Sequence, residues 1–401
     1  MRKDRIIVIA GKNSIACNAV RYLIEGLSYP RNLVKVVACK GDEGKHTWQP
    51  SLVFTAKTLG IDLVSLDCAC EIQDALFVSL EFDRIVQPER ISTKSLYNIH
   101  FSALPAYRGV GMAVWPIVNG ETEAGVTLHE IDWGIDSGNI VSQRRFAIGE
   151  DWTARDLYFA FLDEAFALFR DNIESLVDNV ACSRPQPAIG ASYYSRAELD
   201  YGNLRINFKK TANQVYNQLR GYSFWEYQLP IVDGKKIISS EILSTRSKMK
   251  PGIKIEGADT FATYATVDYD IKLHFSPYDT LYAWARGENV ACSPEGIVDI
   301  DRQDANGWSA AMIAAYHAKA DRLRKLLELG ADVNQSNLRG TTLLMYAKDG
   351  ALSTGNSAAL ELVLRYSADV SARDVQGLSV LDYLQRSGVR SLDDLMRNFV
   401  K

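Results

Sequence analysis

Residues 5–10 read Arg-Ile-Ile-Val-Ile-Ala, in which an uninterrupted apolar run follows Arg5 close to the N-terminus. Such a run is typical of a strand that is buried on both faces of a parallel sheet. Further strands are predicted at residues 33–38, 61–65, 75–79 and 95–100. Between them, residues 15–27 and 52–59 carry apolar side chains at helical spacing. Strands that alternate with helices predict a doubly wound α/β sheet, in which ligands bind beyond the carboxyl ends of the strands.

Length and composition narrow the class of protein. The chain has 401 residues, of which 47% are apolar and 23% charged, as expected for a globular chain of two or three domains. Its net charge of −4 predicts no basic surface for nucleic-acid phosphates. No apolar run approaches the ~20 residues that span a bilayer, and the run at 6–10 is too short for a signal peptide. We therefore expect a cytoplasmic protein that binds neither membrane nor nucleic acid.

Six cysteines are scattered along the chain without the spacing of a zinc site. Thiols stay reduced inside cells, so we expect neither a disulfide framework nor a metal.

A second domain is predicted after the Pro-containing segment 183–190. Aromatic residues are dense there, and residues 235–243 and 262–275 alternate between polar and apolar side chains as strands do. We place a catalytic α/β domain at 1–185 and a small β-rich domain at 186–296. The second domain is also expected to supply the face of a homodimer.

The last part of the chain is a repeat. Gly307, Gly340 and Gly377 open successive copies, and residues 330–334 and 367–371 close the first two. The first two glycines are 33 residues apart, which is the period of ankyrin repeats. The sequence therefore predicts a short helical ankyrin array.

We place this array at residues 297–401, with a four-residue insertion at 352–355 in the second copy. Two and a half copies fall short of the three or so that such an array needs, so its first helices are expected to pack against the preceding domain.

Three polar residues are candidates for acyl transfer to an amine. Asn98 and His100 lie two apart at the end of a predicted strand, so their side chains share one face. Asp136 follows between Gly134 and Gly138, which allow the backbone to approach a ligand closely. An amide can donate to an oxyanion, an imidazole can take the proton of an attacking amine, and a carboxylate can fix its tautomer. The alternative is a buried histidine satisfied by local hydrogen bonds.

The surrounding motifs resemble the folate-dependent formyltransferases. Asn98 and His100 begin the run Asn-Ile-His-Phe-Ser-Ala-Leu-Pro, and Asp136 lies in Asp-Trp-Gly-Ile-Asp-Ser-Gly. The likeness covers roughly residues 5–146 and continues more weakly through 191–230. It implies a Rossmann-like catalytic domain, 10-formyltetrahydrofolate as formyl donor, and Asn98, His100 and Asp136 as the catalytic trio. Whether His100 acts as a base or as a charged stabiliser stays open.

Within this family the chain resembles the enzymes that act on nucleotide-linked amino sugars. The chain is acidic and has no basic tRNA-binding domain, so methionyl-tRNA is a weaker candidate substrate. The combination with ankyrin repeats implies a dTDP-linked 3-amino-3,6-dideoxyglucose as acceptor, for cell-surface polysaccharide such as O-antigen. A dTDP-4-amino-4,6-dideoxyglucose is the alternative acceptor. A scaffold that has lost catalysis and serves as a protein-binding platform is the rival from another class.

Further candidates for substrate contacts surround the trio. Lys12 and Asn13 follow the first strand and could reach the sugar or diphosphate, although no full phosphate-loop pattern is present. Tyr222 and Trp225 could stack on thymine or simply pack in the core. Arg196 suits a diphosphate or is an exposed arginine without a role. The likeness of the middle segment to amino-sugar enzymes adds Tyr194 and Asn207. For folate, the resemblance implies Phe82, Leu104 and Asp132.

Trp308 follows the first repeat glycine, where ankyrin repeats usually carry an exposed polar residue. An exposed tryptophan is a candidate contact for a ligand or partner. We predict that the ankyrin repeats bind a protein or a second nucleotide-sugar through Trp308. Burial against the catalytic domain is the alternative.

Overall fold

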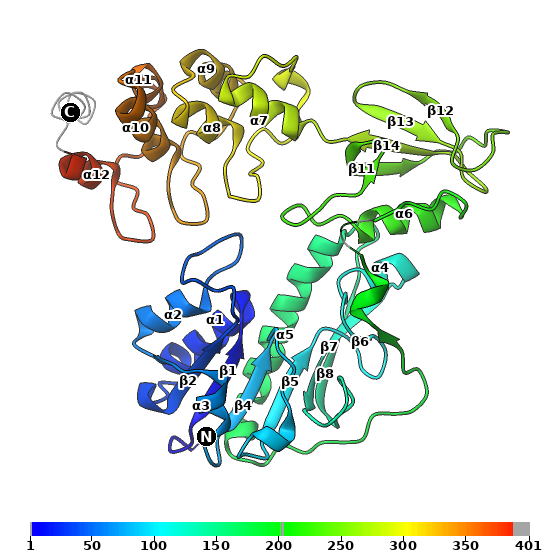
Figure 1. The fold of residues 1–401 in the computed structure, drawn as a ribbon, viewed down its shortest axis with the longest axis vertical. Helices are drawn as coiled ribbons and strands as arrows, with labels where there is room; N and C mark the ends of the chain where they lie inside the picture. Colours follow the sequence, from blue (N-terminus) through cyan, green and yellow to red (C-terminus); the bar gives the residue numbers. More distant parts are fainter. Residues whose placement is uncertain (1, 201, 203, 388–401) are drawn as a thin grey trace. The chain divides into compact units, whose positions relative to one another are not determined.

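The computed structural model describes residues 2–200, 202 and 204–387. The chain divides into two compact units, Met1–Phe275 and Ser276–Lys401, each of which is described here by itself. Figure 1 shows their helices and strands. In the described residues no helix is both long and apolar enough to cross a membrane.

A seven-stranded sheet forms the centre of the first unit, with the order β3-β2-β1-β4-β5-β7-β8. Its first five members are parallel. The strand bounds are β1 Ile7–Gly11, β2 Val34–Ala38, β3 Asp62–Leu63, β4 Leu76–Leu80, β5 Leu96–His100, β7 Glu123–Glu130 and β8 Ile140–Ala147. The predicted mixed α/β fold is confirmed.

The last two strands of the sheet differ from the expected pattern. β7 runs antiparallel to β5, and β8 runs antiparallel to β7. Only a short helix, α4 (Trp115–Asn119), precedes β7, and no helix separates β7 from β8. Antiparallel strands need no crossover helix, so a reading based on strand–helix alternation misses them.

Both faces of the sheet are covered. Ile7 and Ile9 of β1 belong to one apolar cluster with residues of α1, α2 and α5, whereas Val8 and Ala10 belong to a second cluster on the other face. All four side chains are fully buried. Alternation places successive side chains on opposite faces, so the uninterrupted apolar run is a consequence of two packed layers.

The helices of the first unit start and end where the sequence supplies caps. Ser51 accepts the Phe54 N–H at the start of α2, which ends at left-handed Gly60. Thr153 and Asp156 form a reciprocal capping box at the start of the longest helix, α5. The helix bounds are α1 Asn13–Arg21 (continued by a π-turn, Tyr22–Gly26), α2 Leu52–Leu59, α3 Leu66–Cys70, α5 Ala154–Val177 and α6 Ala212–Gly221; the 3-10 turns are Arg31–Leu33, Pro88–Arg90 and Arg196–Glu198.

A second, five-stranded antiparallel sheet completes the first unit, with the order β10-β11-β14-β13-β12. Val215 and Leu219 of α6 pack on its apolar face against Ile237, Ile271 and Leu273. The predicted small β-rich region is therefore present. Its strands are β10 Ile231–Val232, β11 Lys235–Ile242, β12 Lys254–Gly257, β13 Phe261–Tyr264 and β14 Ile271–Phe275; a further pair joins β6 Arg108–Gly109 to β9 Tyr193–Tyr194.

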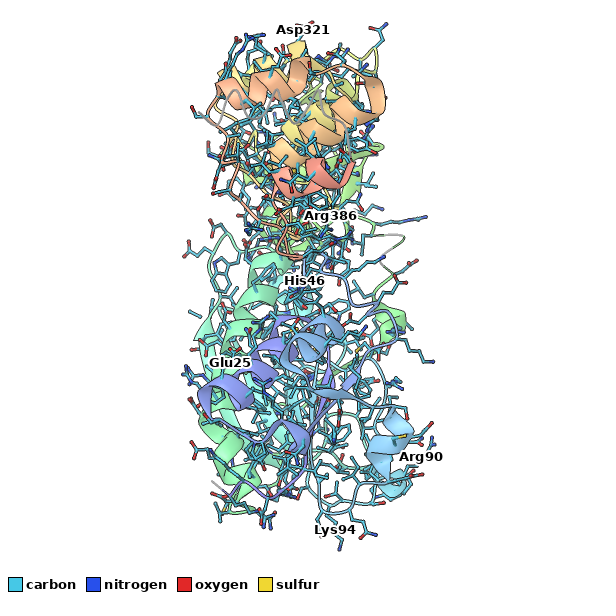
Figure 2. The ribbon with its side chains drawn as sticks, turned by 90° about the vertical axis from the view of Figure 1, so that its left-hand side faces the viewer. Glu25, His46, Arg90, Lys94, Asp321 and Arg386 are labelled. Atoms are coloured by element: carbon cyan, nitrogen blue, oxygen red, sulfur yellow. The ribbon has the colours of Figure 1, made fainter. Side chains whose placement is uncertain are left out.

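Charged side chains cover the outside of the first unit. Glu25, Arg90 and Lys94 are exposed and project outward in Figure 2. The described cysteines are free thiols.

The second unit is helical, as the repeat predicts. Gly307, Gly340 and Gly377 all adopt positive φ, the conformation that makes glycine the natural residue at a repeat turn. The insertion at 352–355 falls at the end of α10, which continues to Thr354. The helices are α7 Tyr278–Arg286, α8 Ala310–Tyr316, α9 Ala320–Glu328, α10 Leu343–Thr354, α11 Ala358–Arg365 and α12 Val380–Ser387, with a 3-10 turn at Pro294–Gly296. The third copy extends beyond the described residues.

Helix α7 precedes the first repeat and packs on α8 within the second unit. The first repeat is therefore covered by a helix of the second unit itself. The domain limits expected from the sequence, and packing of the array on the catalytic domain, stay predictions.

Candidate active site

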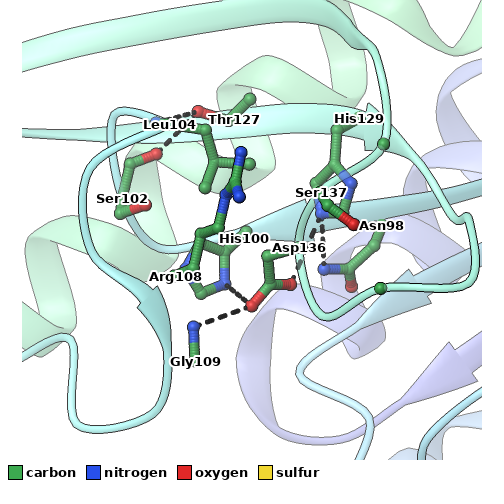
Figure 3. A network of polar contacts seen from close by, with 12 residues as sticks. Asn98, His100, Ser102, Leu104, Arg108, Gly109, Thr127, His129, Asp136 and Ser137 are labelled. Carbon is green, nitrogen blue, oxygen red and sulfur yellow. Dashed lines mark hydrogen bonds and ion pairs between the residues drawn. The ribbon is translucent and has the colours of Figure 1, made fainter. Parts of the chain in front are cut away.

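The site is built where β5 and β7 lie side by side. The antiparallel register pairs Asn98 with His129 and His100 with Thr127. Directly opposed residues of an antiparallel pair project from the same face, so the side chains of Asn98, His100 and His129 are neighbours. Asp136 reaches them from the loop between β7 and β8, where it adopts a positive φ of 53°. Figure 3 shows that the carboxylate lies between His100 and His129.

His100 is buried and held at both ring nitrogens. Its Nε2 lies 2.8 Å from the carbonyl oxygen of Tyr107, and its Nδ1 lies 3.6 Å from Oδ2 of Asp136. A carbonyl only accepts, so Nε2 carries a proton. Burial lowers the pKa of His100, although Asp136 and the Tyr107 carbonyl oppose that shift. The ring is therefore neutral at pH 7, with its free lone pair on Nδ1.

The Asp136 carboxylate is ionised. Burial alone would raise its pKa, but the neighbouring His100 and His129 rings and the Gly109 N–H bring the pKa to about 2. The Gly109 N–H donates to Oδ2 over 2.9 Å, and Oδ1 lies 3.6 Å from Nε2 of His129. Gln186 fixes the same loop because its Nε2 donates to the carbonyl oxygens of Asp136 and Gly138.

Asn98 is oriented by a second histidine. Nδ1 of His129 lies 2.7 Å from the carbonyl oxygen of Glu130, so this nitrogen carries a proton. Nε2 then accepts from Nδ2 of Asn98 over 3.1 Å. One amide hydrogen of Asn98 is used in this way, and the other stays available to a ligand.

Sequence reasoning missed His129. It is the second-last residue of the buried strand β7, two residues after Thr127 on the same face. A polar side chain at the end of an apolar strand was the available signal. Its meaning depends on the antiparallel pairing with β5, which the strand–helix pattern does not reveal.

Lys12 and Asn13 lie at the start of α1, beside the end of β4. The Lys12 N–H donates to the carbonyl oxygen of Leu80. Nδ2 of Asn13 donates to Oε2 of Glu81 over 2.9 Å and to the Tyr158 hydroxyl over 2.7 Å. The helix N-terminus is also occupied, because Oε1 of Gln49 accepts the Ser14 N–H. Asn13 therefore has no side-chain hydrogen to offer a diphosphate.

Tyr194 belongs to an aromatic stack. Its ring stacks on Tyr107 at 5.4 Å and on Trp115 at 4.8 Å, and its hydroxyl accepts from Asn119. This stack fixes the segment that presents the Tyr107 carbonyl to His100. Tyr194 thus supports the site indirectly, through the segment of Tyr107.

The other expected sugar contacts are scattered over the neighbouring segments. Arg196 is exposed at the start of a 3-10 turn. Asn207 is part of a local turn in which its Oδ1 accepts the Lys209 N–H. The Tyr222 hydroxyl accepts from Gln218, and Trp225 is half-buried. The hydrogen bonds described for Asn207 and Tyr222 are thus local and do not involve the trio.

The expected folate contacts are also engaged in the protein. Phe82 carries the guanidinium of Arg84 over its ring at 4.7 Å. Leu104 is only 2% exposed, which leaves its side chain almost no surface for a ligand. Oδ1 of Asp132 accepts from the Gly134 N–H and the Ser137 hydroxyl and so shapes the Asp136 loop.

Trp308 lies in the second unit and is partly buried. Its ring packs against Tyr346 at 4.4 Å and Tyr316 at 5.1 Å. The expectation of a lone exposed tryptophan is therefore replaced by a small aromatic cluster.

Comparisons with known proteins place this site in a family. A formyl transferase family model matches residues 69–173, which include Asn98, His100 and Asp136. A model of three ankyrin repeats matches residues 282–374. WlaRD, a sugar 3N-formyl transferase crystallised in the presence of dTDP and 5-N-formyl-THF, is 39% identical, with a TM-score of 0.63 over 68% of this chain and 97% of that chain.

An N-formyltransferase from Helicobacter canadensis, in complex with folinic acid and dTDP-3-aminofucose, is also 39% identical; the match has a TM-score of 0.63 and covers 68% of this chain and all of that one. A methionyl-tRNA formyltransferase of Sorangium cellulosum is 33% identical over 149 residues, which are 37% of this chain and 47% of that relative. The match thus spans about half the length of that relative. The chain belongs to the formyltransferases. Within them it belongs to the sugar N-formyltransferases, here joined to ankyrin repeats.

Proposed function

We propose that the protein transfers a formyl group from 10-formyltetrahydrofolate to the amine of a dTDP-linked 3-amino-3,6-dideoxy sugar, namely dTDP-3-amino-3,6-dideoxyglucose. Both 39%-identical structures support this proposal, because one is a sugar 3N-formyl transferase and the other holds a dTDP-3-amino sugar. The product would serve cell-surface polysaccharide synthesis, and we place the reaction in the cytoplasm.

The residues of the site fit a formyl donor. Acyl transfer needs one donor for the oxygen on which negative charge develops and one group that takes the amine proton. The second Nδ2 hydrogen of Asn98 meets the first need, and Nδ1 of neutral His100 meets the second. The folate supplies the formyl carbon and leaves as tetrahydrofolate.

His100 acts first as a base in this proposal. Its Nδ1 takes the proton of the attacking amine, and the resulting imidazolium lies between the Tyr107 carbonyl and the Asp136 carboxylate. The imidazolium then gives this proton to the folate nitrogen that loses the formyl group. Both neighbours stabilise positive charge on the ring. Asp136 is ready for this role because its pKa of about 2 keeps it ionised.

The observation that carries the proposal is the convergence of Asn98, His100 and Asp136 on one strand end. Incubation with dTDP-3-amino-3,6-dideoxyglucose and 10-formyltetrahydrofolate should yield the N-formyl sugar, detected by mass spectrometry. Asn98→Ala should lower kcat about 100-fold or more, the usual cost of one oxyanion donor. Near-normal turnover by Asn98→Ala would contradict the role of Asn98 as the oxyanion donor.

The same assay separates the alternatives. If the protein formylates the 4-amino sugar in preference to the 3-amino sugar, the reacting amine is at position 4 of the sugar ring. Absence of product with either sugar, in protein that still binds dTDP-sugar, would favour a scaffold that has lost catalysis. Methionyl-tRNA is a weaker acceptor because the chain carries a net charge of −4. Light scattering tests the expected homodimer.

We propose a separate binding role for the ankyrin repeats, with Trp308 as a contact for a protein or a second nucleotide-sugar. The packing of Trp308 with Tyr316 and Tyr346 supports it, since such clusters suit flat ligands and partner side chains. Calorimetry on the full chain should find a binding event that Trp308→Ala removes. If Trp308→Ala binds the nucleotide-sugar with unchanged stoichiometry, the repeats do not bind a second nucleotide-sugar through Trp308.

A further inference from the structure

A polar cluster that the catalytic trio does not use lies at the carboxyl edge of the sheet. Glu81 follows directly after β4, Asn13 follows β1, and Tyr158 reaches them from α5. Oε2 of Glu81 accepts from Asn13 over 2.9 Å and from the Tyr158 hydroxyl over 2.8 Å. The Tyr158 hydroxyl in turn accepts from Asn13 over 2.7 Å. Three distant segments of the chain thus hold one carboxylate in a fixed place.

The backbone of this cluster is strained. Asn13 and Glu81 adopt φ values of 60° and 55°, in the left-handed region that side chains with a Cβ rarely enter. Asparagine tolerates this region, but a glutamate there is unusual. Backbone strain of this kind persists where the surrounding structure holds it, and it clusters at ligand sites.

All hydrogen-bond donors of the cluster point inward. Asn13 uses both Nδ2 hydrogens, and Tyr158 uses its hydroxyl hydrogen. Within the described residues, Oε1 of Glu81 and Oδ1 of Asn13 accept no hydrogen bond. The cluster therefore offers acceptors only, which suit a ligand that donates, such as a sugar hydroxyl.

The cluster and the reacting centre lie at the same, carboxyl edge of the sheet. Leu80 of β4 pairs with Ile99 of β5, so Glu81 and His100 follow at the ends of neighbouring strands. Neighbouring strands are about 4.8 Å apart. Ligands of such sheets bind beyond this edge, so one ligand can contact residues at the ends of both strands.

We propose that Glu81, held by Asn13 and Tyr158, binds a ring hydroxyl of the amino sugar next to the reacting amine and so selects the sugar. This inference rests on the proposed function. Glu81 is a binding residue here and takes no part in proton transfer. Burial raises the pKa of Glu81 while nearby Lys12 opposes the shift, and a donated hydroxyl would compensate the lost hydration of the carboxylate.

The test compares full-length wild type with Glu81→Gln at saturating folate. KM for the dTDP-amino sugar should rise about 10- to 100-fold, the usual effect of losing a hydrogen bond to a charged group. KM for folate and the pH dependence of kcat should not change. Glu89→Gln, an exposed carboxylate on the following turn, is the control and should behave as wild type.

Deoxy analogues of the sugar identify the hydroxyl. An analogue that lacks the hydroxyl beside the amine should bind wild type more weakly, whereas Glu81→Gln should bind the sugar and this analogue equally well. Calorimetry without folate gives this comparison independently of turnover. Tyr158→Phe, which keeps the ring and removes one donor to Glu81, guards against misfolding and should show a smaller rise in Kd.

Two results would overturn the inference: an unchanged KM in Glu81→Gln, or a change confined to the pH profile. If wild type makes no N-formyl sugar at all, the proposed function fails instead. The two failures are therefore distinguishable.

Discussion

His129 is the residue whose role the geometry defines most sharply beyond the trio. It is 3% exposed and accepts from Asn98 while its other nitrogen donates to a backbone carbonyl. We predict that His129→Ala lowers kcat about tenfold or more, because the Asn98 amide then loses its fixed orientation. His129→Gln, whose carbonyl can also accept from Asn98, should keep part of the activity.

A double-mutant cycle separates positioning from a general structural effect. If His129 acts through Asn98, then His129→Ala should cause no further loss in the Asn98→Ala background. Losses that multiply would show that His129 acts independently of Asn98. Steady-state kinetics on the four proteins, with thermal unfolding as the folding control, gives the answer.

His100 makes a prediction about pH. Burial lowers its pKa, so the ring should titrate below its ordinary value of about 6.5 in the folded protein. Unfolding then takes up a proton at acidic pH, so this histidine's contribution to stability is lost as pH falls below about 6.5. Asp136→Asn removes the charge that opposes the shift, and the pKa of His100 should fall further. NMR titration of the His100 ring, assigned with His100→Asn, measures both; a higher pKa in Asp136→Asn would contradict the electrostatic account.

At the scale of elements, the short strand β6 holds the Asp136 carboxylate in place. Gly109 has a φ of 98°, donates its N–H to Asp136, and pairs with β9 so closely that an added methyl would overlap the carbonyl oxygen of Tyr194. We predict that Gly109→Ala destabilises the first unit by about 1–3 kcal/mol and lowers kcat. Gly190→Ala is the control: its φ is also positive, but the added methyl group meets no neighbour. The difference between the two variants is therefore the cost of the steric overlap at Gly109. Urea unfolding measures the difference, and equal stability of the two variants would contradict the close approach.

The sequence predicts elements better than it predicts their pairing. Helix α2 begins and ends at the expected residues because Ser51 and Gly60 cap it locally. The antiparallel pairing of β7 with β5 joins residues that are far apart in the sequence, such as Asn98 and His129, which are 31 residues apart, so no local pattern predicts it. That pairing alone brings His129 to Asn98.

The same limit applies to the candidate site. Asn98, His100 and Asp136 could be named because their motif is local and specific. Asn13 was expected to reach a diphosphate, but its hydrogens are used by Glu81 and Tyr158, which follow it by 68 and 145 residues. Such distant partners become visible only when the chain is folded.

At the scale of the whole molecule, chemistry and repeats belong to different units. Every residue of the trio and of the Glu81 cluster lies within Met1–Phe275, whereas the ankyrin repeats lie within Ser276–Lys401. A compact unit with its own core can fold alone. We predict that a protein ending at Phe275 keeps the kcat of the full chain for formyl transfer and shows one thermal unfolding transition. Asn98→Ala in the shortened protein is the control for genuine activity. Binding events that disappear with residues 276–401 belong to the repeats, whereas a loss of kcat in a folded, shortened protein would show that catalysis depends on the second unit.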